Sequence, residues 1–273
     1  MGDTGEYSVQ KISSSRTVAI DMMHETVRRH HVKALVEVDV TDARASLRRS
    51  RTENGPNISF TAWLMKCIST AAEEFPEACA LRRGKKLYLF KDIDISTMIE
   101  LRHEGVVMPL PYVVRRTNEK SVEQISAEID VFKRSREAEG EMVLGDEKSS
   151  RWVELYLHLP TSVRRAVWRQ LVRMPRTLKR FGGTIIVTSV GMFGKGGGWA
   201  ITFGLQSLAF AIGGIAHKPS VTPGGIVPRE LLSMTILIDH DVIDGAPAAR
   251  FVARLIELIE NSHGLESYAE PGG

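Results

Sequence analysis

The part of the chain that most restricts its fold is residues 233–264, where the spacing of apolar residues changes. From Ser233 to His240 apolar and polar residues alternate, which places His240 on the apolar side of an extended strand. After Pro247 the apolar residues recur at helical spacing. The two faces consist of Met234, Ile236 and Ile238 in the strand and of Ala248, Phe251, Val252, Leu255, Ile256 and Ile259 in the helix. The sequence therefore predicts an α/β fold with a buried strand followed directly by an amphipathic helix.

This strand-to-helix junction carries a candidate general base. Pro247 suits the first turn of the helix, so Ala246 is the predicted N-cap and the Asp244 side chain is left free to orient another group. A histidine at the end of a strand beside apolar walls can keep a pKa near neutrality and accept a proton from a thiol or hydroxyl. His240 fits that description. From the residues alone, the commoner explanation is a core histidine with satisfied hydrogen bonds and a turn residue at Asp244.

Helical and strand patterns alternate through the rest of the chain. A helix is predicted to begin within Ser13–Ser15 and to precede a strand in which Val36, Val38 and Val40 alternate with acidic residues. Thr61 is the predicted cap of an apolar helix, and Pro76 ends that helix. The other predicted elements are this helix over 62–75, a helix over 122–133 and strands over 86–90, 93–100, 106–114 and 184–190.

A basic segment stands apart from its surroundings. Residues 138–181 open with an acidic stretch, and residues 161–180 then contain seven basic residues and no carboxylate. Apolar residues such as Trp168 and Leu171 lie between the charges, which predicts a basic amphipathic helix interrupted at Pro175. Such a helix could bind an anionic membrane surface, the phosphates of CoA or an acidic acyl carrier; alternatively, it is a lid or surface helix with solvated arginines. The basic residues are Arg164, Arg165, Arg169, Arg173, Arg176, Lys179 and Arg180.

Composition narrows the class of protein. A formal charge of +3 is too small to argue for nucleic-acid binding, and the N-terminal ten residues contain no apolar run typical of a signal peptide. Cys67 and Cys79 are too few for a disulfide framework and lack zinc-ligand spacing. His24, His30 and His31 have no acidic or cysteine ligands at metal spacing. The expectation is a cytoplasmic protein with two reduced structural thiols and no bound metal.

The residues from Asp239 to Ala246 read DHDVIDGA and resemble the HxxxDG signature of the dihydrolipoyl acyltransferase catalytic domain of 2-oxoacid dehydrogenase complexes. Three further segments agree in order: residues 16–42, residues 60–81 and residues 182–194. The resemblance implies the chloramphenicol acetyltransferase-like fold, a two-layer α/β sandwich with a mixed sheet covered by helices. It predicts one catalytic domain over residues 1–273 with the basic segment inserted at about 138–181.

The resemblance also implies roles for individual residues. His240 corresponds to the base that deprotonates the acyl-accepting thiol. Asp244 corresponds to a structural aspartate that pairs with an arginine near the start of the domain, for which Arg16 is the candidate; a solvated helix-terminal charge is the alternative for Arg16.

A hydroxyl on the strand over 184–190 is expected to hold the oxyanion of the tetrahedral intermediate. Alignment of the flanking glycines puts Thr188 at that position, with Ser189 in reserve. Alternation along a strand points the two side chains to opposite faces, so only one of them can serve, and polarity does not choose between them.

In three features the sequence departs from the family, and these features bear on which substrate the chain accepts. Nothing resembling a lipoyl-carrying domain precedes the catalytic-like start, so no lipoyl attachment is expected on this chain. Asp241 stands where an arginine usually follows the histidine. This changes the charge at the mouth of the active site, so the identity of the acyl acceptor stays open. The loop over 191–198 contains five glycines, yet no P-loop lysine-serine pattern, which favours a flexible loop over a phosphate cradle.

The resemblance further implies a homotrimer whose active sites lie between subunits. Larger cages of the family bury an apolar C-terminal tail, whereas residues 261–273 here are polar, so assembly is predicted to stop at the trimer.

The predicted activity is acyl transfer between CoA, or a lipoyl-type thiol, and an acceptor, with acyl-CoA as a substrate. His240 is the predicted base, Thr188 holds the oxyanion, and Asp244 with Arg16 fixes the geometry. Two alternatives remain open: an esterase or thioesterase that uses water as the acceptor, and a catalytically silent trimeric scaffold that uses the basic helix for interaction.

Overall fold

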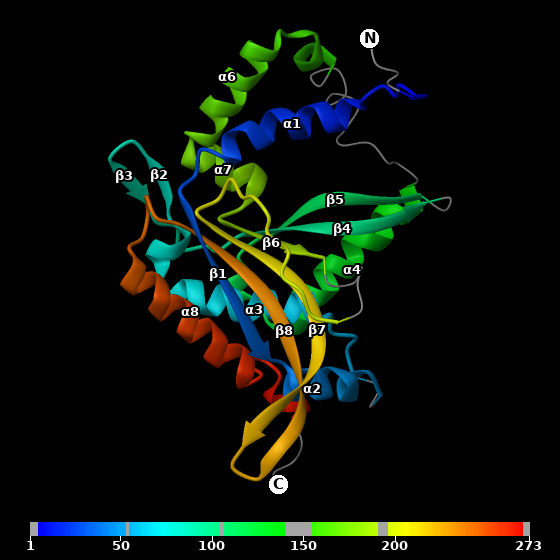
Figure 1. Ribbon diagram of the computed structural model, residues 1–273, viewed down its shortest axis with the longest axis vertical. Helices are drawn as coiled ribbons and strands as arrows, with labels where there is room; N and C mark the ends of the chain where they lie inside the picture. The colour runs from blue at the N-terminus through cyan, green and yellow to red at the C-terminus, as the bar shows by residue number, and fades with distance from the viewer. Residues whose placement is uncertain (1–4, 53–54, 104–105, 140–153, 191–195, 270–273) are drawn as a thin grey trace.

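The computed structural model describes residues 5–52, 55–103, 106–139, 154–190 and 196–269. Its centre is one six-stranded mixed sheet in the order β1-β8-β7-β6-β4-β5, accompanied by a separate two-stranded hairpin, β2-β3 (Figure 1). The strands are β1 (His31–Asp39), β2 (Leu81–Arg83), β3 (Lys86–Tyr88), β4 (Ile95–His103), β5 (Val106–Val114), β6 (Ile185–Ser189), β7 (Leu208–Thr222) and β8 (Gly225–Asp239).

The α-helices are α1 (Ser14–Thr26), α2 (Thr41–Thr52), α3 (Phe60–Glu74), α4 (Val122–Glu139), α6 (Thr161–Val172), α7 (Pro175–Gly182) and α8 (Gly245–Glu260). Short 3₁₀ turns lie at η1 (Pro76–Cys79), η2 (Thr117–Glu119) and η4 (Glu266–Tyr268). No helix in the described ranges combines the length and apolar character needed to cross a bilayer.

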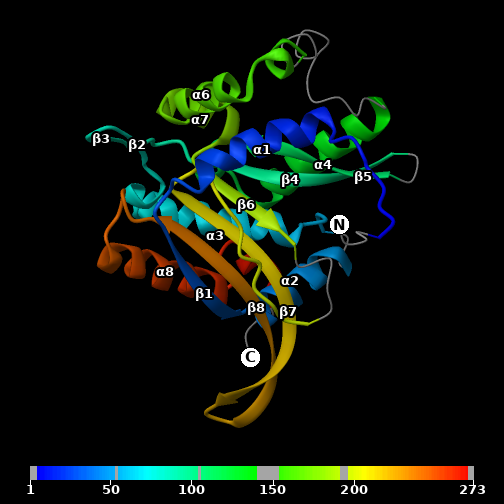
Figure 2. The same ribbon diagram turned by 45° about the horizontal axis from the view of Figure 1, so that its top comes forward.

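The core lies between one face of the sheet and the helices α3, α4 and α8. Alternate residues of the strands, such as Val187, Phe210 and Ile236, pack there against Trp63 of α3 and Phe251 of α8, and all five are fully buried. Figure 2 shows these helices on the same side of the curved sheet, with the β7–β8 hairpin extending past it. The predicted α/β class, with a mixed sheet covered by helices, is confirmed.

Two predicted helix caps are wrong. The Ser59 hydroxyl, not Thr61, caps α3 by accepting a hydrogen bond from the backbone N–H of Ala62 at 3.0 Å, because the helix begins at Phe60. Asp244, not Ala246, holds the N-cap position of α8, whose first residue is Gly245. The side chain of Asp244 makes no capping hydrogen bond, so it is free, as the sequence predicted, although it stands at the cap.

The basic segment forms two helices, α6 and α7, separated where Pro175 starts the second, as predicted. Helix α6 packs on α1 at one end of the molecule (Figure 1). Trp168 and Val172 contact a small apolar cluster of Leu81, Leu178 and Leu205. The expectation of solvated arginines is wrong for Arg164, which is 13% exposed and pairs with Asp21 at 2.7 Å.

The face of the sheet opposite the helices is crossed by the segment that leads into β7. The backbone N–H of Gly198 donates to the Ser233 hydroxyl at 3.1 Å, and Trp199 Nε1 donates to the carbonyl of Val36 at 3.0 Å. A Cβ on Gly214 would lie 2.0 Å from the carbonyl oxygen of Gly196, so glycine is required there. Residues 191–195 of the predicted glycine-rich loop lie outside the described residues.

Candidate active site at the end of β8

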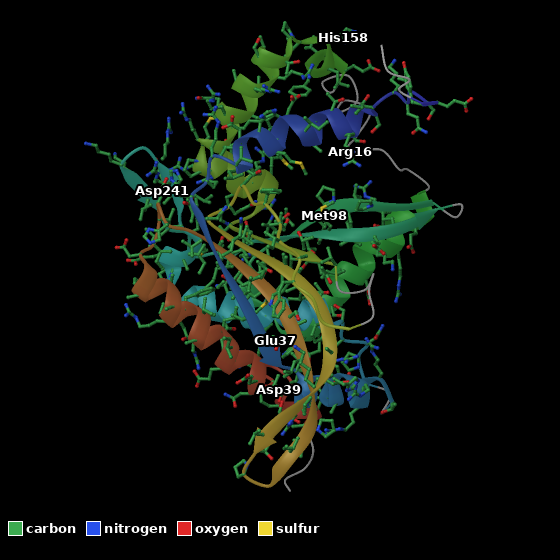
Figure 3. The ribbon with its side chains drawn as sticks, viewed as in Figure 1. Arg16, Glu37, Asp39, Met98, His158 and Asp241 are labelled. Atoms are coloured by element: carbon green, nitrogen blue, oxygen red, sulfur yellow. The ribbon has the colours of Figure 1, made fainter. Side chains whose placement is uncertain are left out.

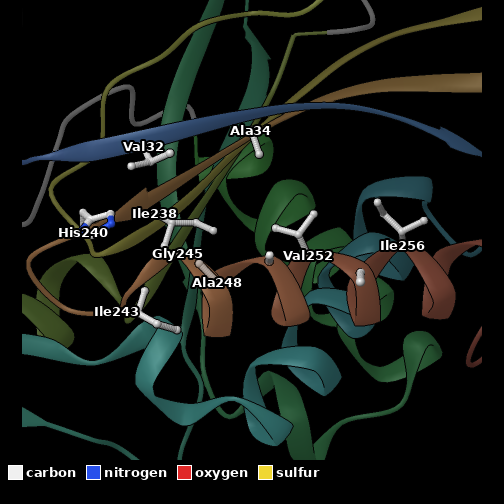
Figure 4. A pocket seen from close by; sticks show the side chains of 11 residues that line it. Val32, Ala34, Ile238, His240, Ile243, Gly245, Ala248, Val252 and Ile256 are labelled. Carbon is white, nitrogen blue, oxygen red and sulfur yellow. The ribbon is translucent and has the colours of Figure 1, made fainter.

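His240 follows the last residue of β8 and lies at one end of an apolar groove. The groove has a volume of about 460 Å³ and runs between the edge strand β1 and helix α8. Figure 4 shows His240 at the end of this groove, with Val252 and Ile256 farther along its helical wall. The remaining lining residues are Val32, Ala34, Ile238, Ile243, Gly245, Ala248, Ala249 and Ala253. A histidine beside apolar walls, as predicted, is therefore present, and its role as a base stays a prediction.

The backbone of His240 is tied to the first strand. Its N–H donates to the carbonyl of His30 at 3.0 Å, and the adjacent residues Asp239 and His31 are paired across β8 and β1. The His240 side chain is exposed, and none of the described residues forms a hydrogen bond with its ring. An unengaged ring at a fixed backbone position can accept a proton from a bound substrate.

A buried ion pair that the sequence did not reveal lies directly behind His240. Asp239, which is 1% exposed, accepts a hydrogen bond from Arg29 Nη1 at 3.1 Å, and Arg29 is 13% exposed. The Asp239 carboxylate also accepts from the backbone N–H of Asp241 at 3.1 Å. Because a buried carboxylate needs a partner, an aspartate in an apolar strand was the signal that could have identified this pair. Asp239 and Arg29 thus fix both backbone neighbours of His240.

Asp241 binds two basic side chains. Its Oδ1 lies 3.0 Å from His30 Nδ1, and its Oδ2 lies 3.4 Å from Arg82 Nη1. The hydrogen bond with His30, with the positive charges of Arg82 and Arg29 beside it, lowers the pKa of Asp241 below its ordinary value. The acidic residue next to His240 is therefore already neutralised by the chain itself.

The structure distinguishes the two candidate hydroxyls. Ile185 and Val187 of β6 belong to the core under the helices, so alternation points Ser189 to that same face and Thr188 to the opposite one. Both residues are half-buried. Thr188 is thus on the face that the helices leave uncovered, which favours it for contact with a ligand or a second chain.

Thr188 and His240 are well separated within one chain. Thr188 pairs with Ala211 of β7, which pairs with Thr235 of β8, two strands away. His240 lies five residues beyond Thr235, so strand geometry puts the two residues roughly 17 Å apart along the strands and about 10 Å across them, or about 20 Å in all. A single chain therefore does not bring the predicted base and the predicted oxyanion donor together.

Arg16 and Asp244 do not form the expected pair in this chain. Arg16 lies in the first turn of α1 and is exposed, and the structure, which describes both residues, records no ion pair between them. Figure 3 shows Arg16 well away from Asp241, which lies near the end of β8. The arginine near the start of the domain that does pair at this site is Arg29, with Asp239 as its partner.

Other groups with reactive potential lie elsewhere. Burial raises the pKa of Cys79 to about 11 and raises that of Cys67 further, so both thiols are protonated and buried. Burial also lowers the pKa of His31, whose Nε2 lies 3.0 Å from the carbonyl of Gln206. Among the described residues, no group of three or more histidine, cysteine or acidic side chains is placed to bind a metal ion.

Comparison with known proteins identifies the family to which the chain is similar. Residues 4–141 and 177–266 match the family described as 2-oxoacid dehydrogenases acyltransferase (catalytic domain). The lipoamide acyltransferase component of the Bacillus subtilis branched-chain alpha-keto acid dehydrogenase complex is 23% identical over 263 residues, which cover 94% of this chain and 53% of that protein. The chain therefore spans about half the length of this curated relative.

Solved structures share the fold. The cubic core of a pyruvate dehydrogenase multienzyme complex superposes with a TM-score of 0.69 at 18% identity, covering 96% of this chain and 95% of that one. The same values hold for a structure of Azotobacter vinelandii dihydrolipoamide acetyltransferase, determined to investigate the role of a serine, a histidine and an asparagine in catalysis. In that enzyme the histidine and asparagine are four residues apart.

Proposed function

Because this chain belongs to the acyltransferase catalytic-domain family of the 2-oxoacid dehydrogenases, we propose that it transfers an acyl group between CoA and a second thiol, with His240 as the base. The observation that carries the proposal is the position of His240, held by its backbone beside the buried Arg29–Asp239 pair, at the end of an apolar groove. His240 and Asp244 also have the four-residue spacing of the histidine and asparagine investigated in the Azotobacter enzyme.

The reaction follows from general acyl-transfer chemistry. The imidazole of His240 takes the proton of the accepting thiol, and the resulting thiolate attacks the thioester carbonyl. The oxyanion of the tetrahedral intermediate accepts a hydrogen bond from the Thr188 hydroxyl. When the intermediate collapses, the carbon–sulfur bond to the departing thiolate breaks, and that thiolate recovers the proton from His240. No net oxidation occurs, and the base returns to its neutral form.

We further propose that each site forms between two chains of a homotrimer. The separation of about 20 Å between Thr188 and His240 in one chain requires a neighbour to supply one of them. The sheet face that carries Thr188, which the helices leave uncovered, also exposes Leu35 and Met98, and exposed apolar residues of this kind are typical of subunit interfaces. The similar cubic core belongs to a multienzyme complex, which supports assembly of this chain.

The apolar groove suggests where the acyl group lies. Apart from His240, its lining is entirely apolar or glycine, and its helical wall from Gly245 to Ile256 extends for roughly 16 Å. A groove of that length fits the hydrocarbon part of an acyl group larger than acetyl.

The proposed acceptor is a lipoyl-type thiol carried by another chain or domain. The proposed compartment is the cytoplasm, where Cys67 and Cys79 would stay reduced.

The catalytic role of His240 can be measured with acyl-CoA thioesters of increasing length, with and without dihydrolipoamide, by following free CoA thiol. Replacing His240 with Gln is expected to lower kcat by about a hundredfold or more, because the thiol loses its base. His158→Gln is the matched control, because His158 is exposed and lies at the far end of the molecule from β8 (Figure 3). Equal rates for the two variants would contradict the proposal.

Subunit mixing tests the shared site. His240→Gln chains and Thr188→Val chains are each expected to be inactive alone; after they are unfolded together and refolded, roughly a quarter of the sites would combine an intact His240 with an intact Thr188. Recovery of activity in the mixture supports a site between chains, whereas no recovery in a correctly assembled mixture contradicts it.

The same assay separates the two alternatives. Release of CoA thiol that requires dihydrolipoamide indicates transfer, and release that does not require it indicates a thioesterase. Absence of release with every chain length would favour a scaffold that has kept the fold of the family.

A further inference from the structure

A second cavity next to His240 is lined mainly by arginines. It has a volume of about 570 Å³ and includes Asp241, the residue that follows His240. Four parts of the chain meet there: the end of α1 with the residues after it, the β2–β3 hairpin, the end of α6 and the turn after β8. We call it the arginine cavity after Arg28, Arg29, Arg82, Arg83, Arg169 and Arg173.

The carboxylates of the arginine cavity do not balance its positive charge. Only two acidic residues, Glu25 and Asp241, line it alongside the six arginines. Glu25 is shared between Arg28 and Arg169, each at 3.6 Å, which is longer than a hydrogen bond. Asp241 is occupied by Arg82 and His30. Asp239, which lies outside the lining, pairs with Arg29, so three carboxylates oppose six arginines and the cavity keeps a net positive charge in the folded protein.

Several guanidinium groups have donors to spare. The Nε of Arg169 is buried, lies 3.6 Å from Glu25 Oε1 and has no hydrogen-bond partner within the described part of the chain. Arg83 and Arg173 are both exposed, and neither forms an ion pair with a described residue. Guanidinium donors bind phosphate oxygens in pairs, and converging arginines are the usual means by which proteins bind phosphate groups. The arrangement points to an anionic ligand with more than one negative charge.

The shape of the arginine cavity favours a small-molecule ligand over the surface of a membrane. The cavity is concave, with a volume in the range of ligand pockets, which run from about 300 to 1,000 Å³. On α6, Arg164 turns toward α1 to pair with Asp21, and Arg169 turns toward Glu25. Basic side chains directed at the body of the protein are poorly placed to meet a flat anionic surface.

From this we infer that the arginine cavity binds the phosphate groups of CoA and thereby positions the thioester at His240. The inference rests on the proposed acyl transfer and adds the site of carrier recognition. CoA carries a pyrophosphate and a ribose phosphate, joined to its thiol by the pantetheine arm, so its charge and its reactive sulfur lie at opposite ends. Arg169 and Arg173 lie within residues 142–176, which the family match leaves out, so this chain's own insertion supplies part of the site.

The decisive comparison is between acyl-CoA and acyl-pantetheine, which has the same thioester but no phosphates. Arg173→Glu is expected to raise KM for acyl-CoA by about ten- to a hundredfold, the value of a charge-assisted hydrogen bond, and to leave kcat nearly unchanged. KM for acyl-pantetheine should stay within about twofold. Arg176→Glu is the matched control, since it makes the same charge change in α7, outside the cavity, at an exposed position.

Arg83→Gln, in the hairpin, provides a second variant and should raise KM for acyl-CoA alone in the same way. An equal effect of Arg173→Glu on both donors, or an equal effect of Arg176→Glu and Arg173→Glu on acyl-CoA, would overturn the inference.

Binding of adenosine 3′,5′-bisphosphate by calorimetry tests the site without turnover. Wild-type protein should bind it, and Arg173→Glu should weaken binding at least about tenfold while Arg176→Glu does not. Binding that follows this pattern in a protein without transfer activity would uphold the arginine cavity and refute the proposed function. Absence of binding, or binding to anionic vesicles that alone depends on Arg173, would refute the arginine cavity as a CoA site.

Discussion

The buried Arg29–Asp239 pair behind His240 makes a quantitative prediction about stability. Asp239 is 1% exposed and its partner is 13% exposed. If one of the two charges is removed, water therefore cannot solvate the other in its place. Replacing Arg29 with Met keeps much of the side-chain volume but leaves a buried carboxylate without its counter-charge. Breaking a buried pair in this way costs about 3–5 kcal/mol of unfolding free energy.

The control is Arg28→Met, one residue earlier. Arg28 is 57% exposed and its nearest carboxylate oxygen is 3.6 Å away, so its loss should change the unfolding free energy by less than about 1 kcal/mol. The assay is urea unfolding followed by circular dichroism at a fixed protomer concentration, because assembly adds to apparent stability.

A double variant measures how much of the lost stability comes from the unpaired buried charge. Arg29→Met combined with Asp239→Asn removes both charges and should recover a large part of the loss, since the uncompensated buried charge is then gone. Equal effects of Arg28→Met and Arg29→Met, or a double variant as unstable as the sum of its parts, would refute the reasoning.

Three further predictions concern the scaffold. Ser59→Ala removes the cap of α3 and should cost about 1 kcal/mol in thermal or urea unfolding, and no change would show that another group caps the helix. Gly214→Ala puts a Cβ 2.0 Å from a carbonyl oxygen and should reduce the yield of folded protein, whereas Gly224→Ala, with nothing within 4 Å, should not; similar yields would contradict the close approach. Burial opposes ionisation of Asp94, but hydrogen bonds from Lys179, the backbone of Arg116 and Arg115 outweigh it and lower its pKa below the ordinary 3.8. A depressed folded-state pKa stabilises the protein above the ordinary pKa, and this contribution is lost as pH falls through the folded value, so Asp94→Asn should flatten the loss of stability below about pH 4; an unchanged acid limb would contradict the assignment.

Periodicity determined the elements around the site. The alternation in Ser233–His240 and the helical spacing after Pro247 predicted a strand, a junction and a helix, and β8 and α8 are found there. These patterns are local, because burial of one face of a strand or helix imposes its period on the sequence. Cap positions were less predictable: Ser59 and Thr61 are both good capping residues, and only the backbone path decides which one precedes the first turn.

The sequence alone thus determined the α/β class, the strand that ends at His240 and the basic insertion broken at Pro175. Tertiary structure alone decided which charges meet: Arg29, not Arg16, pairs at the site, and its partner is Asp239. It also decided that Thr188 faces away from the helices, and that the arginines of α6 converge with those of the hairpin beside Asp241. Such contacts join residues far apart in the chain, and their partners depend on strand register and helix packing, which no local period encodes.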